Sequence, residues 1–205
     1  GIANSTNANE VNALKAMLYY GAATQILKNY NTDNLANEDV EYDAKAISVI
    51  AQDAPAGSVQ AAQAEFAGAN LTLGNAIDIS FFIPKADLPE TGLTAYIVQD
   101  RFGDNQDKSE EIAQANWETS GDNWRIRFSD VAAKEMSDQI TIVIKDAEGN
   151  AVSETYVDSI RAYALRGIAN STNANEVNAL KAMLNYGAAT QILKDYNTDN
   201  LANAD

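Results

Sequence analysis

The side chains that could carry out chemistry in this chain are mainly carboxylates, because the sequence contains neither histidine nor cysteine. It therefore has no Ser-His or Cys-His nucleophile pair, no imidazole base and no zinc site of the usual kind. A glycosidase with two acidic residues remains possible, with Glu110 and Glu111, or Asp100 and Asp104, as candidate pairs. In a sequence so rich in acidic residues such pairs arise by chance, so we predict that the chain is not an enzyme.

Two Asx-rich segments, residues 104–107 and 197–200, could offer oxygen ligands to a cation. Neither fits the calcium-loop pattern, in which acidic residues lead to a glycine and a distant glutamate. Asn and Asp side chains in turns more commonly bond their own backbone. We therefore expect no metal site and no cofactor.

Aromatic and arginine side chains are better candidates for binding. Arg101 and Phe102 are adjacent in the polar loop of residues 100–108, and such residues are the usual anchors of protein interfaces. The alternative is a solvated loop whose Phe102 folds back onto the core. Trp117 lies near a turn, in the core or on the surface, and with Tyr96 it could form a sugar-stacking platform if both were exposed. Trp124 opens a strand and is expected in the core.

The elements that position these residues lie between two nearly identical segments. Residues 1–39 and 167–205 differ at three positions, where Tyr19, Asn29 and Glu38 become Asn185, Asp195 and Ala204. This agreement indicates duplication with an offset of 166 residues. We predict that residues 1–38 are the C-terminal helical tail of a preceding repeat and that the rest is one whole repeat. The alternative is a single domain that uses two identical helices.

Residues 39–156 alternate between short apolar segments and turns, which predicts an antiparallel β-sandwich of about seven to eight short strands. Ile77, Ile79 and Phe81 are expected to share one face. The predicted strands cover residues 47–51, 71–73, 77–83, 93–99, 110–117, 124–128, 139–145 and 151–155.

Residues 157–205 change to helical periodicity and predict a helical hairpin. The first helix runs to about Arg166, with Gly167 as its stop. The second is capped by Ser171 or Asn173 and ends near Tyr196. The same helix is expected at residues 11–30. The fold class is therefore α+β. A change from tyrosine to asparagine is tolerated on an exposed helix face, so Tyr19 and Asn185 are predicted to be largely exposed.

The charge and hydropathy of the chain exclude several partners. A net charge of −15 argues against binding to nucleic acid or to anionic membrane surfaces, which attract Lys and Arg. The sequence has no run of eighteen apolar residues, so we expect no membrane insertion.

The segment KAMLNYGAA at residues 181–189, followed by YNTDNLAN at residues 196–203, resembles a segment that recurs in large tandem-repeat surface proteins of gut Gram-positive bacteria. The resemblance covers the helical part well and the β part only loosely. It implies export, attachment to the cell wall and contact with neighbouring repeats. The immunoglobulin-binding superantigens of gut commensals, which bind antibody variable domains outside the antigen site, resemble this chain in architecture. No contact residue is carried over from them.

The leading hypothesis is a secreted, cell-surface repeat module that binds a host protein, most specifically immunoglobulin. Repetition favours this function because linked weak sites give high avidity. The candidate binding residues are Arg101, Phe102, Trp117 and Tyr96. A structural spacer or stalk of an adhesin and a carbohydrate-binding module are the alternatives. A protruding Arg101-Phe102 loop would favour protein binding, whereas exposed Trp117 and Tyr96 on one sheet face would favour sugar binding.

Overall fold

The computed structural model describes residues 2–47, 63–73, 76–89, 91–103 and 106–204. The chain divides into two compact units. The helical unit comprises residues 1–52, 133–137 and 164–205, and the β unit comprises residues 53–132 and 138–163. The predicted repeat boundaries at residues 39 and 157 stay predictions, because a compact unit groups residues by proximity in space and a repeat groups them by sequence. Within the described residues, no helix is long and apolar enough to cross a membrane.

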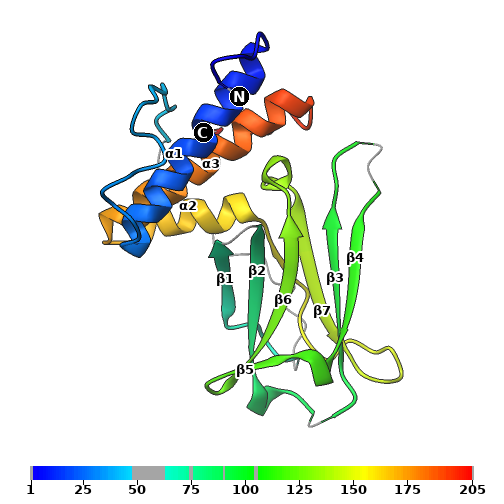
Figure 1. The fold of residues 1–205 in the computed structure, drawn as a ribbon. Coiled ribbons are helices and arrows are strands. Elements are labelled where there is room, and N and C mark those ends of the chain that lie inside the picture. Colours follow the sequence, from blue (N-terminus) through cyan, green and yellow to red (C-terminus); the bar gives the residue numbers. More distant parts are fainter. Residues whose placement is uncertain (1, 48–62, 74–75, 90, 104–105, 205) are drawn as a thin grey trace. The chain divides into compact units, whose positions relative to one another are not determined.

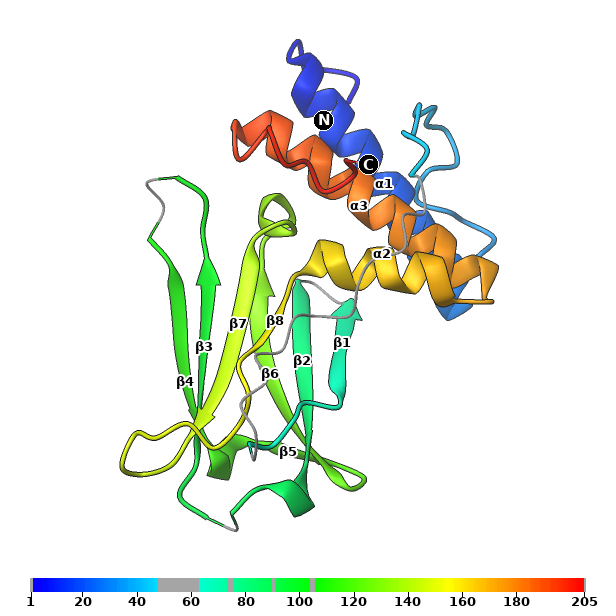
Figure 2. The ribbon, with the colours of Figure 1, turned by 180° about the vertical axis from the view of Figure 1, so that it is seen from behind.

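The strands of the β unit form two four-stranded antiparallel sheets (Figures 1 and 2). One sheet has the order β1-β2-β6-β5 and the other β4-β3-β7-β8. The strands are β1 (Gly68–Leu73), β2 (Ile77–Pro84), β3 (Thr94–Asp100), β4 (Lys108–Ala113), β5 (Glu118–Ser120), β6 (Asn123–Val131), β7 (Gln139–Lys145) and β8 (Tyr156–Asp158). The α+β class with antiparallel strands is confirmed.

Each sheet buries one face, as the alternation of apolar residues predicts. Ile77, Ile79 and Phe81 of β2 are all buried, which confirms that they share a face. The rings of Phe81 in the first sheet and Tyr156 in the second meet edge to face at 5.9 Å. These aromatic rings bring the two sheets into contact, while packing of the sheets as a full sandwich stays a prediction.

Three predicted strands differ from the structure. The strand predicted at residues 110–117 ends at Ala113, because Gln114–Asn116 form a 3-10 helix. Ile47 is buried but lies outside any strand, and the rest of the strand predicted at residues 47–51 lies outside the described residues. Residues 151–155 form only isolated bridges, and β8 begins after them. The reason is local, since the backbone N–H of Ile144 donates to the side-chain Oγ of Ser153 at 2.8 Å. A side chain therefore replaces the carbonyl that a regular strand would offer.

The helical unit contains two helices of the same sequence origin, α1 (Ala8–Lys28) and α3 (Ala174–Lys194). Their N-caps are Asn7 and Asn173, whose side chains accept from two backbone N–H groups each. Their C-caps are Asn29 and Asp195, both left-handed with φ of 50°. The predicted cap at Asn173 is confirmed, and the two copies begin and end alike because caps depend on adjacent residues.

The helix α2 (Ile160–Asn170) contradicts the predicted stop at Gly167, which lies within it. A Cβ on Gly167 would stand 2.6 Å from Cδ1 of Leu180 in α3. The glycine therefore permits close approach of two helices instead of ending one. The helix also begins later than predicted, because Val157 belongs to β8 and Ser159 Oγ accepts from the N–H of Ala162 at 3.0 Å.

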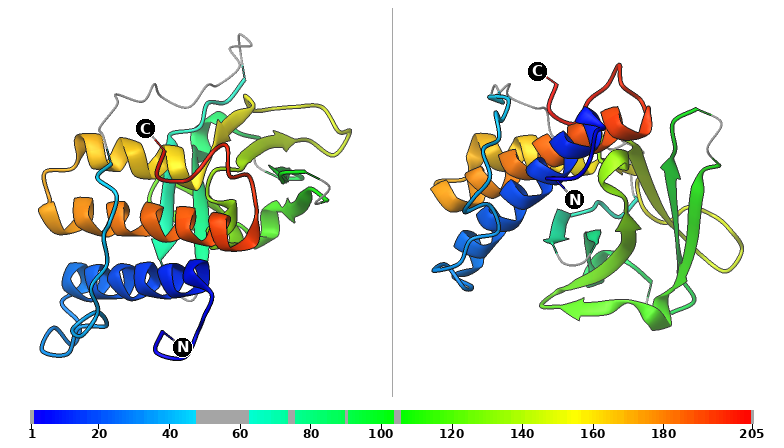
Figure 3. Two further views of the ribbon diagram at one scale, coloured as in Figure 1. Left: turned by 90° about the horizontal axis from the view of Figure 1, so that it is seen from above. Right: turned by 45° about the horizontal axis from the view of Figure 1, so that its top comes forward.

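The helices α1 and α3 lie side by side and antiparallel (Figure 3). Ala13 and Ala16 of α1 pack with Ala189 of α3. Near the middle, the rings of Tyr20 and Tyr186 stack with centroids 6.1 Å apart. These two tyrosines occupy the same position in the two copies, so equivalent residues meet where the helices cross. Packing raises the pKa of Tyr20 to about 12 through burial and through Tyr186, and burial also raises the pKa of Tyr186.

Candidate functional site

The β3–β4 hairpin carries the candidate binding pair. Gly103 adopts φ of 72° in the turn, a value that favours glycine. The backbone N–H of Arg101 donates to Oδ1 of Asp107 at 3.2 Å, which ties the two sides of the loop together. Phe102 is 46% exposed and is therefore not buried in the core. Half-buried Arg101 lies beside it, while Asp104 and Asn105 lie outside the described residues.

The outward face of β3 adds two side chains near this loop. Alternate residues of a strand share a face, so Tyr96 and Val98 lie together. Val98 is 38% exposed, and the ammonium of Lys145 lies 4.5 Å from the centre of the half-buried Tyr96 ring. We name Tyr96, Val98, Arg101 and Phe102 the β3–β4 surface. It combines apolar and aromatic area with the cationic Arg101, a composition that suits contact with a protein, and it is bordered by the exposed acidic residues Asp100 and Glu111.

Trp117 does not join this surface. It is 7% exposed, its Nε1 donates to the carbonyl of Ile112 at 2.9 Å, and its ring meets Trp124 edge to face at 6.0 Å. The paired exposure of Trp117 and Tyr96 that a sugar platform needs is therefore missing. Trp124, expected in the core, is only half-buried and lies under Lys85 at 5.1 Å.

The candidate carboxylate pair of Glu110 and Glu111 is separated by strand geometry. Both residues lie in β4, and neighbours in a strand point to opposite faces. Glu110 is half-buried and Glu111 exposed, in line with this alternation. Among the described residues, no group of three acidic side chains is placed to hold a metal ion. The carbonyls of Asn197 and Asn200 accept from Gln191 Nε2 at 3.3 and 3.0 Å, so this Asx-rich turn anchors to α3.

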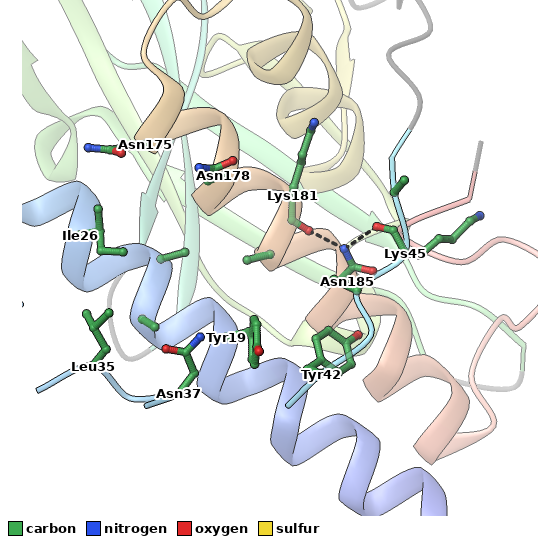
Figure 4. Close-up of a pocket in the computed structure, with 15 residues that line it drawn as sticks. Tyr19, Ile26, Leu35, Asn37, Tyr42, Lys45, Asn175, Asn178, Lys181 and Asn185 are labelled. Atoms are coloured by element: carbon green, nitrogen blue, oxygen red, sulfur yellow. Dashed lines mark hydrogen bonds between the residues drawn. The ribbon is translucent and has the colours of Figure 1, made fainter. Parts of the chain in front are cut away.

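A pocket of about 440 Å³ lies in the helical unit between α1, α3 and residues 35–46 (Figure 4). Tyr19 and Tyr42 contribute its aromatic side, with ring centroids 5.4 Å apart. The Tyr19 hydroxyl donates to the carbonyl of Val40 at 2.9 Å. On the other side, Asn185 Nδ2 donates to the carbonyls of Lys45 and Lys181, both at 3.1 Å. Sequence reasoning missed this pocket because its walls come from both copies of the duplicated segment.

The predicted exposure of Tyr19 and Asn185 is wrong. Asn185 is 2% exposed, and its Oδ1 accepts from Nδ2 of Asn203 at 2.9 Å. Tyr19 is half-buried. Each residue has its own polar partners in its own surroundings, Val40 for Tyr19 and Lys45, Lys181 and Asn203 for Asn185.

No family model matches this chain, and comparisons with curated proteins and with solved structures find no match.

Proposed function

We propose that this chain is a non-enzymatic module of a repetitive bacterial surface protein and that it binds a host protein through the β3–β4 surface. The observation that carries the proposal is the 46% exposure of Phe102 beside Arg101 at a hairpin tip. An exposed aromatic side chain next to arginine is the composition of interface hot spots. Repetition of the module would add avidity to a single weak contact.

Immunoglobulin is the host protein that we propose first. This choice rests on the resemblance of the helical segment to surface proteins of gut Gram-positive bacteria and on their superantigen members. Secretion and attachment to the cell wall belong to the same proposal. The net charge of −15 also favours a partner that presents basic side chains.

The test is binding of the purified chain to immobilised intact antibody, Fab and Fc, measured separately. Phe102→Ala is expected to weaken binding by at least about tenfold, as truncation of a hot-spot residue does. Ile26→Ala is the matched control, because Ile26 is similarly exposed, at 41%, but lies on α1. Loss of affinity with Ile26→Ala and not with Phe102→Ala would reject the β3–β4 surface. No binding to any of the three would reject immunoglobulin.

A spacer is the second candidate function, and the pairing of α1 with α3 favours it. Two copies of one segment pack with each other in the helical unit, which is a way to join successive repeats. A spacer needs no ligand, so Phe102→Ala would leave adhesion of the whole surface protein unchanged. Carbohydrate binding is the third, and buried Trp117 weakens it. A glycan array tests it directly.

A further inference from the structure

The two copies of the duplicated segment have very different exposure. Met17 in α1 is 40% exposed, whereas its counterpart Met183 in α3 is fully buried. Tyr30, which follows α1, is 70% exposed, whereas its counterpart Tyr196 is 4% exposed. Each pair has the same residue type and the same local structure, so the difference comes from what packs against each copy.

Residues 133–137 and the second half of α2 cover the α3 copy. A Cβ on Gly187 would stand 2.6 Å from Sδ of Met136 and 3.2 Å from the carbonyl oxygen of Ala133. The ammonium of Lys134 lies 4.4 Å from the centre of the Tyr196 ring. Gly167 of α2 packs against Leu180. The covering segments thus contact Leu180, Gly187 and Tyr196 of the α3 copy.

The α1 copy keeps all of these recognition residues. We call Leu14, Met17, Gly21 and Tyr30 the α1 outer face; they are the counterparts of Leu180, Met183, Gly187 and Tyr196. The nearest atom to a Cβ on Gly21 is Cβ of Ala36 at 3.3 Å, within the same copy's own tail. None of the three positions that differ between the copies belongs to the outer face.

We propose that the α1 outer face docks a second copy of residues 133–137 and α2, supplied by a preceding unit of the same polypeptide. The identity of the occupant follows from α3, where Leu180, Gly187 and Tyr196 are covered by these segments, and Met183 beside them is fully buried. Supply in cis is favoured because in a separate molecule the equivalent segments already hold their own α3. The inference rests on the repeated-module part of the proposed function and is independent of binding to a host protein.

One helix then serves two units. Its outer face completes the unit before it, and its inner face, through Tyr20, pairs with α3 of the next unit. The outer contact joins unlike surfaces, a heterologous arrangement that can link units without closing.

The test compares this chain with a longer one in which another copy of residues 40–166 precedes Gly1. Both are treated with dilute hydrogen peroxide, and sulfoxide formation is followed at each methionine. In the present chain Met17 is expected to oxidise readily, while Met136 and Met183 are protected by burial. In the longer chain, oxidation of Met17 should slow by about tenfold or more, to the rate of Met183. The peptides that contain Met17 and Met183 are told apart by mass, because the first contains Tyr19 where the second contains Asn185.

Protection of Met183 in the same molecule shows that the helical unit is folded. Rapid oxidation of Met17 in the longer chain, with Met183 still protected, would overturn the proposal. A second measurement uses Gly21→Ala, which should be harmless in the present chain and lower Tm in the longer one, where Met136 of the added copy would meet the new methyl group. An equal effect in both chains would also overturn it.

Discussion

Gly21 and Gly187 offer a matched pair of substitutions in one sequence context. Both occupy the same position in helices of nearly identical sequence. A Cβ on Gly187 would meet Met136 Sδ at 2.6 Å and Ala202 Cβ at 2.9 Å, distances that real Cβ atoms do not show. A Cβ on Gly21 would meet only Ala36, at 3.3 Å, and Ala36 is exposed and can shift.

Two opposing effects set the magnitude. Alanine stabilises a helix interior by about 0.5–1 kcal/mol relative to glycine, because it loses less backbone entropy. Overpacking of a core costs about 1–3 kcal/mol. At Gly21 little overpacking opposes the gain in helix propensity, so Gly21→Ala should be neutral or stabilising by up to ~1 kcal/mol. Gly187→Ala must displace fully buried Met136, so the overpacking cost wins and a net loss of roughly 1–2 kcal/mol is expected.

Thermal unfolding followed by helical circular dichroism measures both variants. One kcal/mol corresponds to about 2–4 °C for a chain of this size, so the expected difference of about 1–3 kcal/mol between the variants separates their Tm values by roughly 2–12 °C. Equal Tm changes for Gly21→Ala and Gly187→Ala would refute the packing difference between α1 and α3. A destabilised Gly21→Ala with a normal Gly187→Ala would show that the two helices exchange roles.

Three further predictions concern the helix pair and the β unit. Tyr20 has a pKa of about 12 in the folded chain and 10.0 as its ordinary value, so the unfolded chain ionises first. The contribution of neutral Tyr20 to the free energy of unfolding is therefore fully present below pH 10 and is lost as pH rises toward 12. Tyr20→Phe should reduce this loss of stability in a pH series of urea melts. Asn185→Tyr should lower the free energy of unfolding by roughly 2 kcal/mol, because the hydrogen bonds of a buried amide are lost. Tyr19→Asn should lower it by less, and equal losses in urea melts would contradict this. Trp117→Ala truncates a core residue and should lower the free energy of unfolding by about 3–5 kcal/mol, whereas Phe102→Ala should lower it by less than about 0.5 kcal/mol. A Trp117→Ala variant of unchanged stability would show that this ring does not belong to the core.

Much of the β unit could be predicted because strand periodicity is local. Ile77, Ile79 and Phe81 alternate with more polar residues, and all three are buried in β2. Strand alternation also points Glu110 and Glu111 to opposite faces of β4, which follows from the sequence once the strand is assigned. Trp117 could not be placed from sequence, because the ring of Trp124 and the carbonyl of Ile112 decide its burial.

The sequence alone determined the duplication, the absence of histidine and cysteine chemistry, and the matching ends of α1 and α3, whereas it placed the end of α2 wrongly at Gly167. Asn7 and Asn173 cap their helices in the same way, since capping involves residues only two or three positions apart. Tertiary structure alone decided which copy is buried. Met17 and Met183 have the same adjacent residues in sequence, yet one is 40% exposed and the other 0%. Burial depends on segments that are distant in the chain, here residues 133–137 and α2, and local sequence does not specify which copy they contact.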